Sequence, residues 1–168
     1  MNAIVYTSNT GSTARYAEWL AHETGLPVYP AQKAKKELPA HSEILYLGWI
    51  MAGNIKGYAN AARRYKICAV CGVGMGRTGT QIHELRMKNH ISDEMPLFTL
   101  QGDFHLEKLH GIYKLMMQIM TQTAGKALAA KSDRTPDEED MLDMIRCSGE
   151  RICPDHLKAV LDWYNEQK

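Results

Sequence analysis

Short apolar runs alternate with amphipathic stretches along this chain, and the alternation predicts its secondary structure. The apolar runs are candidate strands, at Ala3–Thr7, Pro27–Tyr29, Ile44–Trp49, Ile67–Val73 and Leu97–Gln101. Apolar residues at helical spacing predict helices at about Ser12–His22, Tyr58–Arg64, Thr80–Lys88, Leu106–Leu128 and Asp155–Gln167. Strands separated by helices are typical of right-handed crossovers, and therefore of a parallel sheet with helices on both faces.

The predicted fold is α/β, a three-layer, doubly wound parallel sheet of five strands in the order 2-1-3-4-5. Ligands of such sheets bind at the carboxyl ends of the strands where the strand order reverses, here between the first and third strands. A chain of 168 residues fits one domain, residues 1–168, and no repeat or low-complexity segment divides it.

The loop after the first strand is the most informative segment. It reads S-N-T-G-S-T, which is wholly hydroxyl, amide or glycine, and the first predicted helix follows at once. Such a turn is typical of an anion site, because its backbone N–H groups and the helix N-terminus point at the ligand. The candidate anion-binding residues are Ser8, Asn9, Thr10, Gly11, Ser12 and Thr13. Helix capping alone needs fewer polar residues, and the lysine that nucleotide-triphosphate loops require is absent.

The same segment resembles the flavodoxin signature. The signature positions are filled by Ile4, Val5, Tyr6, Ser8, Gly11, Thr13, Ala17 and Leu20. The resemblance implies a flavodoxin-like fold that binds flavin mononucleotide (FMN) without a covalent bond, with neutral donors on its phosphate. The later segments G-W-I-M-A-G-N-I, Q-G-D-F and P-D-E-E-D-M-L are similar to the flavodoxin-domain family, which includes the menaquinone-dependent protoporphyrinogen oxidases.

Two further loops are predicted to contact the flavin ring. A flavin ring needs a flat apolar wall, and Trp49 or Met51 after the third strand could supply it, although ordinary core packing explains Trp49 equally well. The predicted contacts of this loop are Trp49, Ile50, Met51, Ala52 and Gly53. The glycine-rich loop after the fourth strand is expected to wrap the edge of the ring with Gly72, Val73, Gly74 and Met75.

The loop after the fourth strand also supports an alternative reading as a cysteine phosphatase. Cys71, five residues, and Arg77-Thr78 match the C-x5-R-[ST] pattern, in which a thiolate attacks a phosphate cradled by amides. Val70 stands where that signature has histidine, and no aspartate precedes Asp93 as a general acid. Residues 74–79 also match the weak G-x-G-x-x-G dinucleotide pattern.

Two functions follow from the flavin reading: an electron carrier between protein partners, or a small oxidoreductase. The oxidoreductase would act on a quinone or another small molecule beside Gln101–Phe104, and the sequence names no catalytic residue. The basic half of the chain contains the anion loop, since residues 1–92 hold 11 Lys and Arg against 5 Glu, and residues 93–168 hold 9 against 14 acids. No nucleic-acid partner is expected.

The remaining chemistry is sparse. Four cysteines without a signal peptide indicate reduced thiols and a cytoplasmic protein, and no metal-ligand spacing is present. No apolar run is long enough to span a membrane. The Met-rich segment Ile112–Met120 is predicted to be a helix buried against the sheet, with a membrane-surface or partner face as the weaker alternative.

Overall fold

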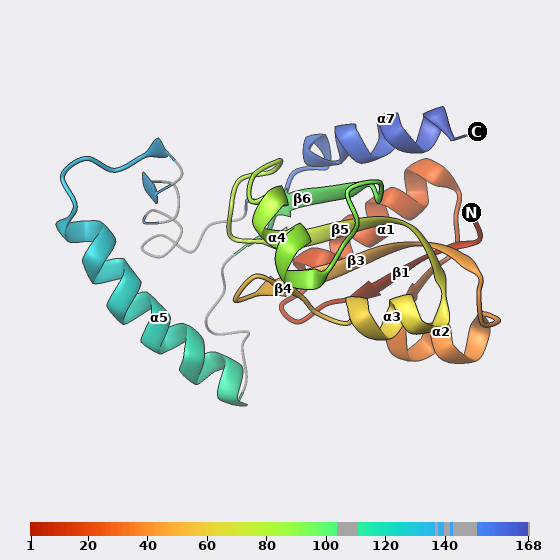
Figure 1. Ribbon diagram of the computed structural model, residues 1–168, viewed down its shortest axis with the longest axis horizontal. Coiled ribbons are helices and arrows are strands. Elements are labelled where there is room, and N and C mark those ends of the chain that lie inside the picture. Colours follow the sequence, from red (N-terminus) through yellow and green to blue (C-terminus); the bar gives the residue numbers. More distant parts are fainter. Residues whose placement is uncertain (104–110, 137, 140–141, 143–150, 168) are drawn as a thin grey trace.

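A parallel β-sheet forms the centre of the molecule in the computed structural model, which describes residues 1–103, 111–136, 138–139, 142 and 151–167 (Figure 1). Its parallel strands are β1 (Ala3–Thr7), β2 (Val28–Pro30), β3 (Glu43–Met51), β5 (Lys66–Gly74) and β6 (Leu97–Gln101). They lie in the order β2-β1-β3-β5-β6. A further short strand, β4 (Asn54–Ile55), pairs antiparallel with the end of β3. The α/β class and the parallel sheet are therefore confirmed, whereas β4 was not predicted and makes the sheet six-stranded.

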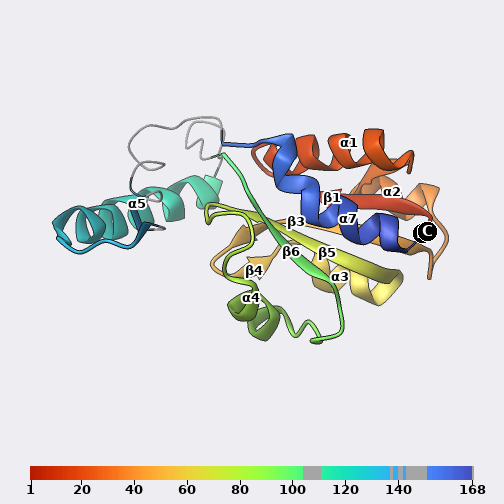
Figure 2. The same cartoon turned by 90° about the horizontal axis from the view of Figure 1, so that it is seen from above.

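Helices cover both faces of this sheet. One face carries α1 (Ser12–Thr24), the 3-10 turn η2 (Pro154–Leu157) and α7 (Lys158–Glu166), and the other carries α2 (Ala31–Glu37), α3 (Tyr58–Arg64) and α4 (Ile82–Asn89). Figures 1 and 2 show the resulting three layers. The helix α2 was not predicted.

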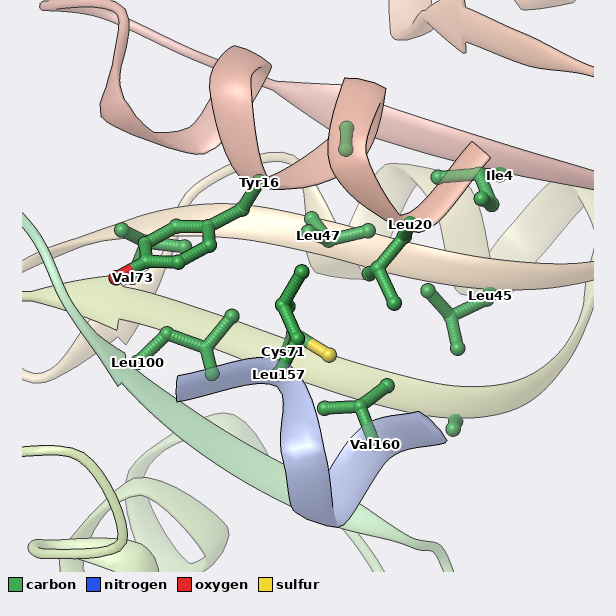
Figure 3. Close-up of a cluster of buried hydrophobic side chains, with 12 residues drawn as sticks. Ile4, Tyr16, Leu20, Leu45, Leu47, Cys71, Val73, Leu100, Leu157 and Val160 are labelled. Carbon is green, nitrogen blue, oxygen red and sulfur yellow. The ribbon is translucent and has the colours of Figure 1, made fainter. Parts of the chain in front are cut away.

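The strand side chains alternate between two cores, one on each face of the sheet. Leu45 and Leu47 of β3 pack with Tyr16 and Leu20 of α1, and Figure 3 shows this core together with Cys71 of β5. Ile44 and Tyr46 of β3 belong to the other core, which also contains Ala34 of α2, Ala61 of α3 and Leu85 of α4. The alternation decides which side chains of a strand face α1 and which face α3 and α4.

The long helix α5 (Gly111–Ala130) does not lie on the sheet. Both views show it standing away from the sheet and its covering helices. Leu115 is 56% exposed and Ile119 is 54% exposed, so the prediction of a helix buried against the sheet is wrong for these two side chains. The predicted start of this helix, at Leu106, lies outside the described residues.

None of the helices in the described residues combines the length and the apolar character that crossing a membrane would take.

Candidate functional site: the loop before α1 and the strand ends beside it

The loop between β1 and α1 turns at Gly11. This residue is the N-cap of α1 and has a φ of 109°, a backbone conformation that glycine adopts without strain. The Ser8 hydroxyl oxygen accepts a hydrogen bond from the Gly11 N–H at 3.3 Å, and the Arg15 N–H donates to the Gly11 carbonyl at 3.0 Å to begin the helix. A Cβ built on Gly11 would meet no atom within 4 Å, so the space beside the backbone is open at this point.

The N-terminus of α1 has no side-chain cap within the part of the chain that the structure describes, although four hydroxyl residues surround its start. Within the described residues, the N–H groups of Ser12, Thr13 and Ala14 have no hydrogen-bond partner. The first turn of a helix leaves such N–H groups for a side chain, water or a ligand. Together with the helix dipole, they form a donor set for an anion.

Ser12 links this loop to the end of β6. Its hydroxyl oxygen accepts a hydrogen bond from the Asp103 N–H at 3.2 Å, so its own proton remains available to donate. The Asp103 carboxylate accepts hydrogen bonds from the Arg151 and Ile152 N–H groups, the latter at 3.1 Å. This role of Asp103 was not predicted from the Q-G-D-F segment, because the partners of Asp103 are distant in sequence.

A buried hydroxyl fixes the next turn of α1. The Tyr16 hydroxyl donates to the Gln101 carbonyl at 2.6 Å and lies 2.7 Å from the Nδ1 atom of His156. Because the single hydroxyl proton is used on Gln101, Nδ1 must carry the proton in its bond to the Tyr16 oxygen. Burial raises the pKa of Tyr16, which keeps the hydroxyl protonated. Helix α1, β6 and η2 are therefore tied together beneath the loop.

The end of β3 places Trp49 next to the loop. Thr7, the last residue of β1, is paired with Gly48 of β3. Ser8 and Trp49 are the next residues of the two neighbouring segments. Alternation along β3 puts Trp49 on the same face as Leu47, which is the α1 face. The side chain of Trp49 is partly exposed, and the Lys56 ammonium lies 5.9 Å from its ring centroid. An indole in this place can form an apolar wall beside the anion-binding loop.

Met51 and Val73 complete this side of the strand ends. Met51 follows Trp49 on the same face of β3 and is buried, and Val73 of β5 is paired with Trp49 and belongs to the α1-side core. Of the predicted ring contacts, Trp49, Met51 and Val73 therefore lie on the α1 face of the sheet.

Ile50 lies on the opposite face of the sheet and packs over Gly72 and Gly74, a structural role that was not predicted. A Cβ on Gly72 or Gly74 would lie 3.0 Å from Cδ1 of Ile50, which means that Ile50 already fills the space over both glycines. Gly72 is also inside the sheet, between Gly48 and Thr99. Its backbone therefore has a ladder partner on both sides. These glycines allow Ile50 to pack.

Ala52 and Gly53 also have a structural role that was not predicted. They form the tight turn between β3 and β4, with φ of 46° and 74°. The Asn89 side chain of α4 donates to the Gly53 carbonyl at 2.8 Å and accepts from the Ile55 N–H at 2.8 Å. These bonds hold the turn against α4. They also fix the end of β3, which carries Trp49 and Met51.

The loop after β5 covers the outer edge of β6. The Gly79 N–H donates to the Thr99 carbonyl at 3.1 Å, and the Thr78 hydroxyl oxygen accepts from the Gln101 N–H at 3.0 Å. This segment satisfies backbone groups of an edge strand. Met75, at the start of the loop, is partly exposed, and its flavin contact stays a prediction.

Burial of Cys71 argues against the phosphatase reading. The side chain is fully buried in the core between β5 and α1, as Figure 3 shows, and burial raises the pKa of its thiol. A nucleophilic cysteine needs access and a lowered pKa. Arg77 is exposed and donates to the Pro136 carbonyl at 3.1 Å. The motif is therefore present in sequence, but its cysteine is packed as an apolar residue.

Within the described residues, no group of three or more His, Cys, Asp and Glu side chains is placed to hold a metal ion. Cys68, Cys71 and Cys153 are free thiols, and Cys147 lies outside the described residues. The part of the predicted acceptor loop at Phe104 also lies outside them.

Comparison of the sequence with models of known protein families gave no match, and neither did comparison with curated proteins.

Proposed function

We propose that this protein binds FMN non-covalently at the loop before α1 and uses it in electron transfer. The observation that carries the proposal is the uncapped N-terminus of α1 inside a loop of neutral hydrogen-bond donors. The open space at Gly11 and the free proton of Ser12 fit a phosphate group without a counter-ion. In flavodoxins, which this segment resembles, the phosphate of FMN is held in this way.

The strand ends beside the loop support a flavin in particular among phosphate ligands. Trp49 directly follows the β3 residue that pairs with the end of β1, and it offers an aromatic wall on the α1 face, which Met51 and Val73 share. FMN would supply the redox chemistry, and the residues around it would orient the ring and exclude water. Met75, partly exposed just after β5, is one further apolar candidate.

The acceptor remains a choice between a redox partner protein and a small molecule such as a quinone. The flavodoxin-like strand order, the single domain and the cytoplasmic location stay predictions with it. No observation in the structure favours the cysteine phosphatase, because Cys71 is buried.

The experiment that tests the cofactor is titration of the purified protein with FMN and with riboflavin. Riboflavin lacks the phosphate, so each lost hydrogen bond to the loop should cost about 1 to 1.5 kcal/mol, and more for a charged acceptor. We expect FMN to bind on the order of a hundredfold more tightly than riboflavin, from several such bonds. Calorimetry or flavin fluorescence measures both affinities.

Two variants locate the site. The double change Thr10→Ala with Thr13→Ala should weaken FMN but leave riboflavin nearly unchanged, because it removes donors to the phosphate. Thr24→Ala, at the other end of α1, where the hydroxyl donates to the Leu20 carbonyl, is the control and should change neither affinity. Equal affinity for FMN and riboflavin in the unaltered protein would overturn the assignment of the loop.

A further inference from the structure

A pocket lies on the face of the sheet opposite α1. It is a groove of about 320 Å³ between α2 and α3, and it reaches the carboxyl end of β1 at Ser8. Its apolar lining includes Val5, Ala61 and Tyr65, which belong to the core on this face. A groove of this size is within the range of small-molecule sites.

The polar lining of this groove has only neutral and cationic groups. Gln32 and Lys35 come from α2, Asn60 and Arg64 come from α3, and no carboxylate lines it. Gln32, Lys35 and Asn60 are exposed, and their side chains make no hydrogen bond within the described residues. The groove therefore offers unused donors and a positive charge to a ligand.

Arg64 is already fixed in position. Its Nη2 atom donates to the Lys35 carbonyl at 2.9 Å and to the Leu38 carbonyl at 3.4 Å, and its Nε atom donates to the Tyr65 hydroxyl at 3.2 Å. The guanidinium carbon lies 5.5 Å from the Tyr65 ring centroid. These bonds close the end of α2, and they leave the Nη1 atom without a partner in the described part of the chain. A cation held rigidly in this way loses little entropy when it binds an anion.

We propose that the groove between α2 and α3 binds a small organic anion. A carboxylate or phosphate group would bind to Lys35 and Arg64, and an apolar body would lie against Val5, Ala61 and Tyr65. The charged groups of this site, Lys35 and Arg64, lie on the face of the sheet opposite Trp49, and the groove meets the proposed FMN site at Ser8.

Calorimetry with three probes of one shape tests this site. The probes are 1-naphthyl phosphate, 1-naphthoate and the uncharged 1-naphthalenemethanol, each added to protein saturated with FMN and to protein without it. We expect at least one of the two anions to bind in both states, and to bind at least tenfold more tightly than the alcohol. The anion that binds more tightly identifies the preferred charged group.

Neighbouring lysines of α2 provide the matched control. Lys35→Gln should weaken the bound anion by roughly tenfold, since it removes a charge-assisted contact. Lys36→Gln removes the same charge from an exposed residue that does not line the groove, and should change the affinity less than twofold. Asn60→Phe should block the groove and abolish binding, with circular dichroism to verify the fold.

Four results would overturn this inference: neither anion binds, the alcohol binds as tightly as both anions, the two lysine variants weaken binding equally, or FMN displaces the anion. The first three do not depend on whether FMN binds, because each is also read in protein without FMN, whereas the fourth applies only where FMN binds. Conversely, failure to bind FMN leaves the predicted difference between Lys35→Gln and Lys36→Gln unchanged.

Discussion

Gly11 combines two properties that can be separated by substitution. Its positive φ makes any side chain strained, at a cost of about 1 to 2 kcal/mol for an L-residue in the left-handed region. Its Cβ position is open, so a methyl group would project into the space beside the uncapped N–H groups of α1. We expect Gly11→Ala to lower the free energy of unfolding by about 1 kcal/mol and to weaken FMN binding as well. Urea unfolding and FMN titration measure the two effects.

Gly25 provides the control, because it closes the other end of the same helix. It has a φ of 71° and equally open surroundings. Gly25→Ala should therefore cost a similar amount of stability and leave FMN affinity unchanged. If both variants weaken FMN to the same extent, Gly11 acts through stability alone, and the loop is not the phosphate site.

For single residues, motifs whose members are adjacent in the chain could be predicted from the sequence, but the burial of a side chain could not. The hydroxyl-rich loop could be recognised because its donors are adjacent in the chain, and Gly11 sits where the turn needs it. Cys71 carries an equally local motif with Arg77, yet the structure buries its thiol beneath α1. Burial depends on which helix covers the strand, and that information is not in the motif.

The contact between α1 and η2 has a pH-dependent member, His156. Desolvation lowers the pKa of His156 below its ordinary value near 6.5, with Asp155 opposing the shift. As the pH falls, the unfolded chain therefore takes up this proton before the folded protein does. The contribution of His156 to stability is full above about pH 6.5 and is lost as the pH falls through the lowered pKa.

Urea unfolding between pH 7.5 and pH 5 tests this contact. We expect the protein to lose more stability over that range than His156→Asn, which lacks the titrating ring, while other titrating groups contribute equally to both. An identical pH dependence in the two proteins would mean that His156 is solvated as it is in the unfolded chain.

Among the elements, the long apolar strands were predicted and the short elements were missed. β3 and β5 have central apolar runs that their neighbours on both sides bury. β4 has two residues, and the turn before it, in which Ala52 has a positive φ, is held at Gly53 by Asn89 of α4, which is remote in sequence. α2 buries only Ala34, so its sequence has no apolar stripe that would indicate a helix. Contacts from distant segments define both elements.

At the scale of the whole molecule, the sheet and its five covering helices form a layered body, and α5 stands apart from it (Figures 1 and 2). The apolar composition of α5 predicted burial, because helices that are apolar on most sides are usually internal. Composition does not say against which surface a helix packs. The two faces of the sheet are already covered, by α1 and α7 on one side and by α2, α3 and α4 on the other.

The position of α5 leads to a prediction about where stability resides. Leu115 and Ile119 are one turn apart on α5 and more than half exposed, so replacing both with Gln should change the free energy of unfolding by less than about 0.5 kcal/mol per site. Leu20 of α1 is 1% exposed in the core against β3, and Leu20→Ala should cost about 2 to 5 kcal/mol. Urea unfolding followed by circular dichroism compares the variants. A loss above about 2 kcal/mol from the two Gln substitutions would show that α5 packs against the protein, as its apolar pattern alone predicted, and that the exposed arrangement is wrong.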